Sequence, residues 1–136
     1  MATGLPSGLV IGADTIVVFR QQILGKPLDE AQATEMLQKL QGDRHEVFTG
    51  VALIDAATGR KATTFERTEV LFRSLGAEEI RQYVATGEPL DKAGAYGAQG
   101  IGAAFVASIV GSYSNVVGLP LATLSLMLME FGYKRF

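Results

Sequence analysis

The chain has 136 residues, which is the length of one domain, and it can bury a core of its own. Hydrophobic residues make up 48% of it, charged residues make up 19%, and the formal net charge is -2. This balance excludes a disordered chain and gives no electrostatic reason to expect binding to nucleic acid or to a membrane surface. Because cysteine is absent, a disulfide framework and a thiolate metal site are excluded as well. We expect one soluble, cytoplasmic domain over residues 1–136.

The first predicted element is a strand over Leu9–Phe19. This run is almost continuously apolar and has β-branched residues near both ends, a pattern typical of a strand that is buried on both faces. A single acid, Asp14, interrupts the run. A turn at Gly25-Lys26-Pro27 follows it.

A helix is predicted after this turn. Asp29 is expected to cap its N-terminus, with Gln32 completing a capping box, and Gly42 suits its C-terminal cap. Four apolar residues at helical spacing predict the buried face of this helix. These are Ala33, Met36, Leu37 and Leu40.

Strands and helices alternate along the rest of the chain, with two loops that are rich in glycine. Strands are expected over 46–54, 61–72 and 104–110, helices over 77–85 and 121–131, and loops over 87–102 and 111–118. Because strands and helices are mixed and no repeat is present, the sequence indicates an α/β domain.

Asp14 is the first candidate for chemistry. An acid inside a run of valine and isoleucine is costly unless it is paired, hydrogen-bonded or bound to a metal. Ligands also tend to bind at the ends of inner strands in α/β sheets. The structural alternative is that Asp14 bonds a neighbouring backbone N–H. The residue pattern leaves both interpretations open.

Lys26 is the second candidate. The glycine before it lets the backbone approach a ligand, and the proline after it stiffens the turn, so that its cation could meet a phosphate. The alternative is an ordinary surface turn.

The glycine-rich loop carries the remaining candidates, which are Asp91, Lys92 and Gln99. A carboxylate can hold a divalent ion or activate water, a lysine can neutralise phosphate, and a glutamine can read the edge of a base. The alternative is solvated charge in a turn. The glycines match neither a Walker loop nor the dinucleotide fingerprint. His45 is the only histidine, and we expect it to have a structural or solvent-facing role.

Five segments of the chain occur in the order and at the approximate spacing of one known family. They are Gly12-Ala13-Asp14-Thr15, Gly25-Lys26-Pro27, His45 to Val51, Gly87 to Gly100, and Gly111 to Pro120. Together they resemble the Maf-like family of nucleoside triphosphate pyrophosphatases, whose members are associated with septum formation. The long loop from Gly87 to Gly100 is the most specific of the five segments.

The resemblance implies a fold similar to the inosine triphosphate pyrophosphatases, with an elongated mixed sheet flanked by helices and a nucleotide cleft between two lobes. It also implies hydrolysis of a nucleoside triphosphate to the monophosphate and pyrophosphate with a divalent metal cation, Mg²⁺ or Mn²⁺. The sequence Tyr-Gly-x-Gln at 96–99 resembles the branch that acts on dTTP and UTP.

The resemblance further implies roles for six residues. Asp14 is the implied proton acceptor that activates water. Thr15 and Gln99 match positions that set substrate choice. The others would bind substrate phosphate or its metal: Lys26, Lys92 and Asp91.

Family members open with a strand, a Ser-x-Ser-Pro-Arg-Arg loop that binds phosphates, and a helix, whereas this sequence starts just before the strand that carries Asp14. The expectation is an N-terminally truncated domain that lacks the first strand and helix, exposes apolar sheet surface and has reduced activity. The alternative is an impaired short form that acts as a nucleotide-binding or septum-related regulatory protein. The expected partner is a nucleoside triphosphate, without nucleic acid or membrane, and a homodimer is left open.

Overall fold

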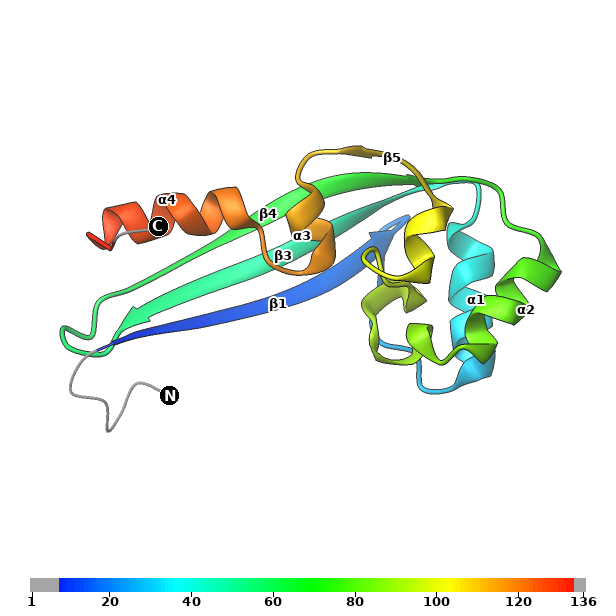
Figure 1. The fold of residues 1–136 in the computed structure, drawn as a ribbon, viewed down its shortest axis with the longest axis horizontal. Coiled ribbons are helices and arrows are strands. Elements are labelled where there is room, and N and C mark those ends of the chain that lie inside the picture. The colour runs from blue at the N-terminus through cyan, green and yellow to red at the C-terminus, as the bar shows by residue number, and fades with distance from the viewer. Residues whose placement is uncertain (1–7, 134–136) are drawn as a thin grey trace.

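A five-stranded sheet forms the framework of the chain in the computed structural model, which describes residues 8–133 (Figure 1). The strands are β1 (Leu9–Phe19), β2 (Gln22–Leu24), β3 (Arg44–Asp55), β4 (Lys61–Phe72) and β5 (Val106–Val110). Their order in the sheet is β2-β1-β3-β4-β5. Figure 1 shows β1, β3 and β4 running along the molecule, so the sheet is elongated as expected.

Every pairing between the described strands is antiparallel, so the expectation of a mixed sheet is wrong for residues 8–133. For two of the four pairings, β1 with β2 and β3 with β4, the physical reason lies in the connections. Arg20 and Gln21, both with positive φ, form a two-residue hairpin turn between β1 and β2, and a short turn joins β3 to β4. Such short turns can join only antiparallel neighbours. The three-residue strand β2 was not predicted.

Within residues 8–133, four α-helices and three 3₁₀ helices accompany the sheet. They are α1 (Glu30–Leu40), α2 (Ala77–Ala85), η1 (Glu88–Asp91), η2 (Ala93–Ala95), η3 (Ile101–Phe105), α3 (Tyr113–Val117) and α4 (Leu121–Glu130). None of the helices in the described part of the chain is long and apolar enough to cross a bilayer.

The cap of α1 confirms its predicted start. The backbone N–H of Gln32 donates to Asp29 Oδ1 at 2.8 Å, and the side chain of Gln32 accepts from the N–H of Leu28 at 2.6 Å. Gly42 follows the helix with φ +67°, a conformation that glycine adopts without strain. The predicted apolar face of α1 is buried.

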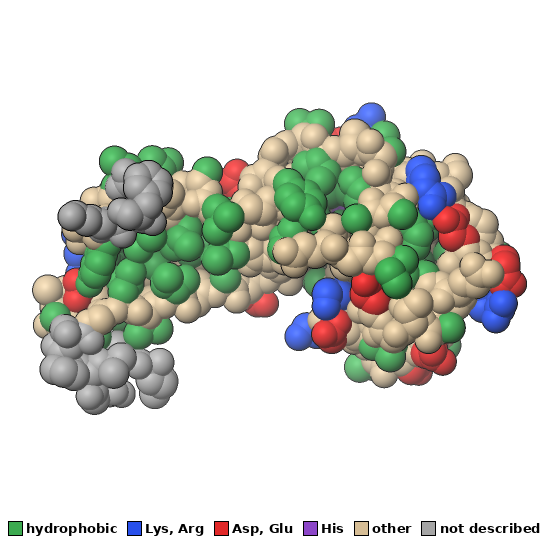
Figure 2. Space-filling model, in the orientation of Figure 1, with side chains coloured by type: hydrophobic (Ala, Val, Ile, Leu, Met, Phe, Trp, Pro, Cys, Tyr) green, Lys and Arg blue, Asp and Glu red, His purple; other side chains and the backbone are tan. Residues whose placement is uncertain are grey.

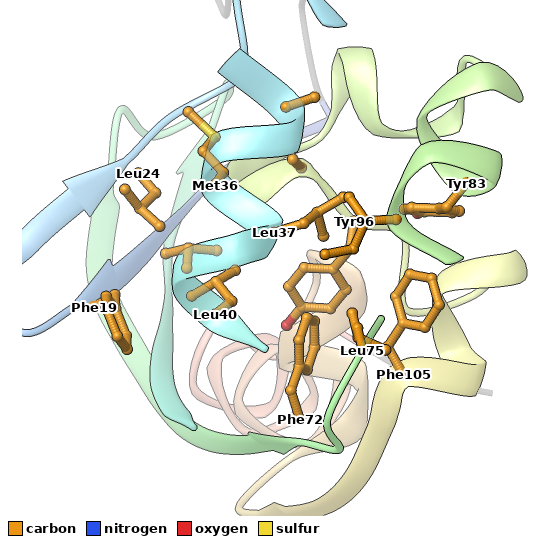
Figure 3. Packing of buried hydrophobic residues seen from close by; sticks show 14 of the residues in the cluster. Phe19, Leu24, Met36, Leu37, Leu40, Phe72, Leu75, Tyr83, Tyr96 and Phe105 are labelled. Carbon is orange, nitrogen blue, oxygen red and sulfur yellow. The ribbon is translucent and has the colours of Figure 1, made fainter. Parts of the chain in front are cut away.

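Two hydrophobic clusters occupy opposite ends of the sheet. One cluster lies at the end that carries α1 and α2. There, Phe72 of β4 packs edge to face against Tyr96 of the glycine-rich loop (residues 87–102, called the loop below), with 4.6 Å between the ring centroids (Figure 3). At the other end, α4 packs Leu124 and Met127 against Val51 and Leu53 of β3. Burying each of these large side chains contributes roughly 1.5–3 kcal/mol, so each cluster fixes its own end of the sheet.

β1 is not buried on both faces, contrary to the prediction. Residues 11–14 are exposed, and the side chain of Ile11 is 46% accessible. The reason is that β2 pairs only with Val17–Phe19, so residues 9–16 have no described strand on that edge. Figure 2 shows further hydrophobic side chains exposed over the end of the molecule where α4 lies. Within α4, the side chain of Leu126 is exposed. The expectation of exposed apolar surface is therefore met.

The segment 111–118, expected to be a loop, contains the short helix α3. Ser112 caps this helix, because its Oγ accepts from the N–H of Asn115 at 3.2 Å. The segment 87–102 forms neither an α-helix nor a strand, as predicted, but it folds into consecutive 3₁₀ turns. The predicted strand at 104–110 begins two residues later, at Val106.

Candidate active site

Two adjoining pockets contain all six of the residues selected from the sequence. The first, of about 190 Å³, lies between β1, the Lys26 turn, the loop and α3. Its lining includes Asp14, Thr15, Lys26, Asp91 and Lys92. The second pocket, of about 450 Å³, is lined by the loop and α3 and includes Gln99. Lys92, Tyr96, Val116 and Val117 line both pockets.

Asp14 and Thr15 are brought to the first pocket by the pairing of β1 with β3. Asp14 lies opposite Gly50, which has no side chain to crowd it, and Thr15 lies opposite Thr49. Asp14 is exposed, so the buried acid on which the sequence argument relied is not observed. Its carboxylate instead stands at the rim of a solvent-accessible pocket, where it can meet a water molecule or a ligand.

The hydroxyl of Thr15 is oriented by a chain of hydrogen bonds. Thr49 Oγ1 donates to the carbonyl oxygen of Asn115 at 3.1 Å and lies 2.9 Å from Thr15 Oγ1. Because the single hydroxyl proton of Thr49 is already used, Thr15 donates to Thr49. The lone pairs of Thr15 Oγ1 are then available to accept a hydrogen bond from a ligand in the pocket.

Lys26, Asp91 and Lys92 give the first pocket its charges. The N–H of Gly94 donates to the carbonyl of Gly25 at 3.1 Å, which ties the Lys26 turn to the loop. Lys92 Nζ lies 2.8 Å from Asp91 Oδ1. This hydrogen bond, the charge of Lys92 and the charge of Lys26 lower the pKa of Asp91, so its carboxylate is ionised at neutral pH.

Tyr96 anchors the loop that separates the two pockets. Its hydroxyl lies 2.7 Å from Nε2 of His45, and both side chains are buried. Burial lowers the pKa of His45 to about 4 and raises that of Tyr96, so the pair is neutral at pH 7. His45 therefore has the structural role expected of it.

Asn115 fixes α3 to the sheet and was missed by the sequence reasoning. It is fully buried, and its Nδ2 donates to the carbonyls of Val47 and Glu66, both at 3.1 Å, and to Thr68 Oγ1 at 2.8 Å. These bonds hold α3 so that Val116 and Val117 form a wall of both pockets. Serine is a preferred N-cap residue, so Ser112 is the local signal that could have indicated the start of α3.

Glu88 was missed as well, although it lines the second pocket. It belongs to the Gly-Glu-Pro segment at the start of the glycine-rich loop, and no separate feature of the sequence assigns it a function.

The donors available for a divalent cation are carboxylates. No group of three or more histidine, cysteine, aspartate or glutamate side chains that could hold a metal occurs among residues 8–133. Asp14 and Asp91 nevertheless line the same pocket. Mg²⁺ is commonly held by one or two carboxylates together with waters and substrate phosphates, and this donor set fits that requirement.

Comparison with known proteins finds one matching family model and several similar sequences. The family model described as Maf-like protein matches residues 1–131. The dTTP/UTP pyrophosphatase of Pelotomaculum thermopropionicum is 56% identical over 129 residues, covering 95% of this chain and 68% of the relative. That of Moorella thermoacetica is 54% identical over 132 residues, covering 97% and 68%. That of Bacillus cytotoxicus is 57% identical over 123 residues, covering 90% and 63%.

The chain thus spans about two thirds of the length of these relatives. The family match covers nearly all of its residues, including both pockets. The chain belongs to the Maf-like protein family.

Proposed function

We propose that this chain is a nucleoside triphosphate pyrophosphatase that hydrolyses dTTP and UTP to the monophosphate and pyrophosphate. The observation that carries the proposal is the convergence of Asp14, Lys26, Asp91 and Lys92 on one pocket that adjoins a larger one. The identity of 54–57% to relatives named dTTP/UTP pyrophosphatase supports the choice of reaction.

Asp14 is suited to act as the base. In this hydrolysis the oxygen of a water molecule bonds to the α-phosphorus. The bond from that phosphorus to the oxygen bridging the α and β phosphates breaks, and pyrophosphate departs. The water proton goes to the exposed carboxylate of Asp14. Such a proton transfer contributes about 10²–10⁴-fold to a rate.

Lys26 and Lys92 supply positive charge where the triphosphate would lie. Because phosphoryl transfer is catalysed mainly by positioning and by neutralising charge, these ammonium groups would stabilise the departing pyrophosphate. Asp91 would hold a divalent cation, Mg²⁺ or Mn²⁺, whose chemistry is to neutralise phosphate oxygens in the same way. The pairing with Lys92 keeps Asp91 ionised for this purpose.

The larger pocket is suited to the base and sugar. Val116, Val117 and Tyr96 provide apolar and aromatic surface, and Gln99 provides one donor group and one acceptor group. A glutamine amide complements the adjacent N–H and C=O groups of uracil and thymine. The hydroxyl of Thr15 lies at the junction with the first pocket and can accept a further hydrogen bond.

The proposal is tested by the products. The purified chain is incubated with Mg²⁺ and with dTTP, UTP, 7-methyl-GTP or ATP in turn, and pyrophosphate and orthophosphate are measured separately. We expect pyrophosphate from dTTP and UTP in preference to the other two. Release of orthophosphate would identify a different bond and contradict the proposal. Binding of dTTP without hydrolysis would favour the alternative of a nucleotide-binding protein.

A further inference from the structure

Glu88 stands at the start of the loop, and its side chain turns back under the loop's far end. Its Oε1 accepts from the N–H of Ile101 at 3.0 Å, and its Oε2 accepts from the N–H of Gly102 at 3.0 Å. The carboxylate thus ties residue 88 to a segment that lies 13 and 14 positions further along the chain.

Tyr83 of α2 extends this contact to a third backbone group. Its buried hydroxyl donates to Glu88 Oε2 and accepts from the N–H of Gly97 at 2.9 Å. Glu88 and Tyr83 together therefore hold both ends of the segment Gly97–Gly102. Gln99 lies within this segment and lines the larger pocket.

The segment is shaped around the carboxylate. A Cβ atom added to Gly100 would lie 2.0 Å from Glu88 Oε1, and one added to Gly97 would lie 3.1 Å from Oε2. The loop can approach Glu88 this closely because these two positions are glycines.

The carboxylate is ionised and fully engaged. Partial burial raises the pKa of Glu88, but the hydrogen bonds from Tyr83, Gly102 and Ile101 outweigh it and lower the pKa below its usual value. Both carboxylate oxygens already accept hydrogen bonds from the protein. Glu88 is therefore poorly placed to serve as a base or as a metal ligand, although it lines the pocket.

We propose that Glu88 is a positioning residue for nucleotide selection, which holds the segment Gly97–Gly102 in place so that Gln99 faces the base. It acts through the loop and does not touch the reacting atoms. The proposal deepens the proposed function, and its activity readouts rest on that function.

The first test needs no nucleotide. Hydrogen exchange of individual backbone amides is measured by NMR for the wild-type chain, for Glu88→Gln and for Glu78→Gln, an exposed control on α2 that pairs with Arg81. Because glutamine keeps the shape but has only one acceptor oxygen, we expect about tenfold faster exchange at Ile101 or at Gly102 in Glu88→Gln alone. Unchanged exchange at both amides would overturn the proposal.

The second test separates positioning from catalysis. We expect Glu88→Gln to raise KM for dTTP about tenfold while kcat changes less than about twofold. In a Gln99→Ala background the same substitution should change KM less than about twofold, because the residue through which it acts is absent. Additive effects of the two substitutions, or a fall in kcat at unchanged KM, would overturn the proposal.

The two tests also separate this proposal from the proposed function. A wild-type chain that releases no pyrophosphate from dTTP would count against the proposed function. The amide exchange rates of Ile101 and Gly102 would still decide whether Glu88 holds the loop.

Discussion

Nε2 of His45, on β3, lies 2.7 Å from the hydroxyl oxygen of Tyr96 in the glycine-rich loop, and both side chains are buried. The pair connects the sheet to the loop that lines both pockets. Because burial lowers the pKa of His45 to about 4, the ring is neutral at pH 7. Protonation would place a charge in the core beside Phe72, so this connection depends on pH.

The stability of the chain should fall in mild acid because of His45. Its folded-state pKa of about 4 is below the ordinary value of 6.5, so the unfolded chain takes up the proton first as the pH falls. The contribution is present above pH 6.5 and is lost towards pH 4. We expect the free energy of unfolding to drop by about 2 kcal/mol between pH 7 and pH 5 from this group.

Urea unfolding at the two pH values measures this drop, and His45→Gln is the matched variant because it cannot titrate. The interval lies above the ordinary pKa values of carboxyl groups, which limits their contribution. An equal loss of stability in the wild-type chain and in His45→Gln would show that another group is responsible.

Asn115→Ala should destabilise the chain by about 2–4 kcal/mol. The substitution removes a buried amide that donates to two backbone carbonyls and to Thr68 Oγ1, and each of these acceptors loses one hydrogen bond. Gln38→Ala, at an exposed position of α1, is the control and should change stability by less than about 0.5 kcal/mol. Denaturant unfolding compares the two variants, and similar small effects would mean that α3 is held by other contacts.

Gly94→Ala should destabilise the chain more than Gly59→Ala. Both glycines have positive φ, of +71° and +74°, so alanine is strained by about 1–2 kcal/mol at either position. A Cβ atom at position 94 would in addition lie 2.9 Å from Val17 Cγ2, whereas one at position 59 meets nothing within 4 Å. The difference between the unfolding free energies of the two variants therefore measures how closely the loop approaches β1. Adding Val17→Ala to Gly94→Ala should recover part of the lost stability, because it removes the atoms that the new Cβ would meet.

Lys92→Ala should reduce kcat/KM for dTTP by about 10–100-fold, because Lys92 lines both pockets and would lose a charged contact to phosphate. Lys39→Ala removes the same charge from α1, where Lys39 pairs with the exposed Glu35, and should leave kcat/KM unchanged. Steady-state kinetics of both variants separate two explanations. Loss of a local contact to phosphate would lower kcat/KM in Lys92→Ala alone, whereas loss of one positive charge from the whole protein would lower kcat/KM equally in both variants.

The elements with strong local signals were predictable from the sequence. The start of α1 is indicated by the capping pair Asp29 and Gln32, and its buried face is indicated by its apolar spacing. β4 is indicated by a long run of residues that favour strands. The strand β2 is only three residues long and α3 only five, too short for periodicity to show. The antiparallel order of the sheet depends on the connections between strands, which residue patterns do not reveal.

The candidate site residues could be named from the sequence, but the construction of the pockets that they line could not be predicted from it. The motifs identified Asp14, Lys26 and Lys92, and the structure brings these side chains to one pocket. The side-chain hydrogen bonds of Asn115, and those of Glu88 with Ile101 and Gly102, join residues 13 to 68 positions apart, and nothing in the local sequence predicts such partners. The prediction that Asp14 is buried was wrong for a related reason. The burial of a residue on β1 depends on which other segments pack beside that strand, and the local sequence does not contain this information.

The role of Asp14 is tested most directly by pyrophosphate release from dTTP with Mg²⁺ in wild-type, Asp14→Asn and Asp29→Asn chains. Asp29 lies outside the two pockets, and asparagine caps a helix as well as aspartate does. Asp29→Asn therefore controls for the replacement of a carboxylate by an amide. We expect the wild-type and Asp29→Asn chains to release pyrophosphate at similar rates. We expect Asp14→Asn to be slower by about 10²–10⁴-fold while dTTP binding persists. Equal release by Asp14→Asn and the wild-type chain would contradict the proposed role of Asp14 as the base.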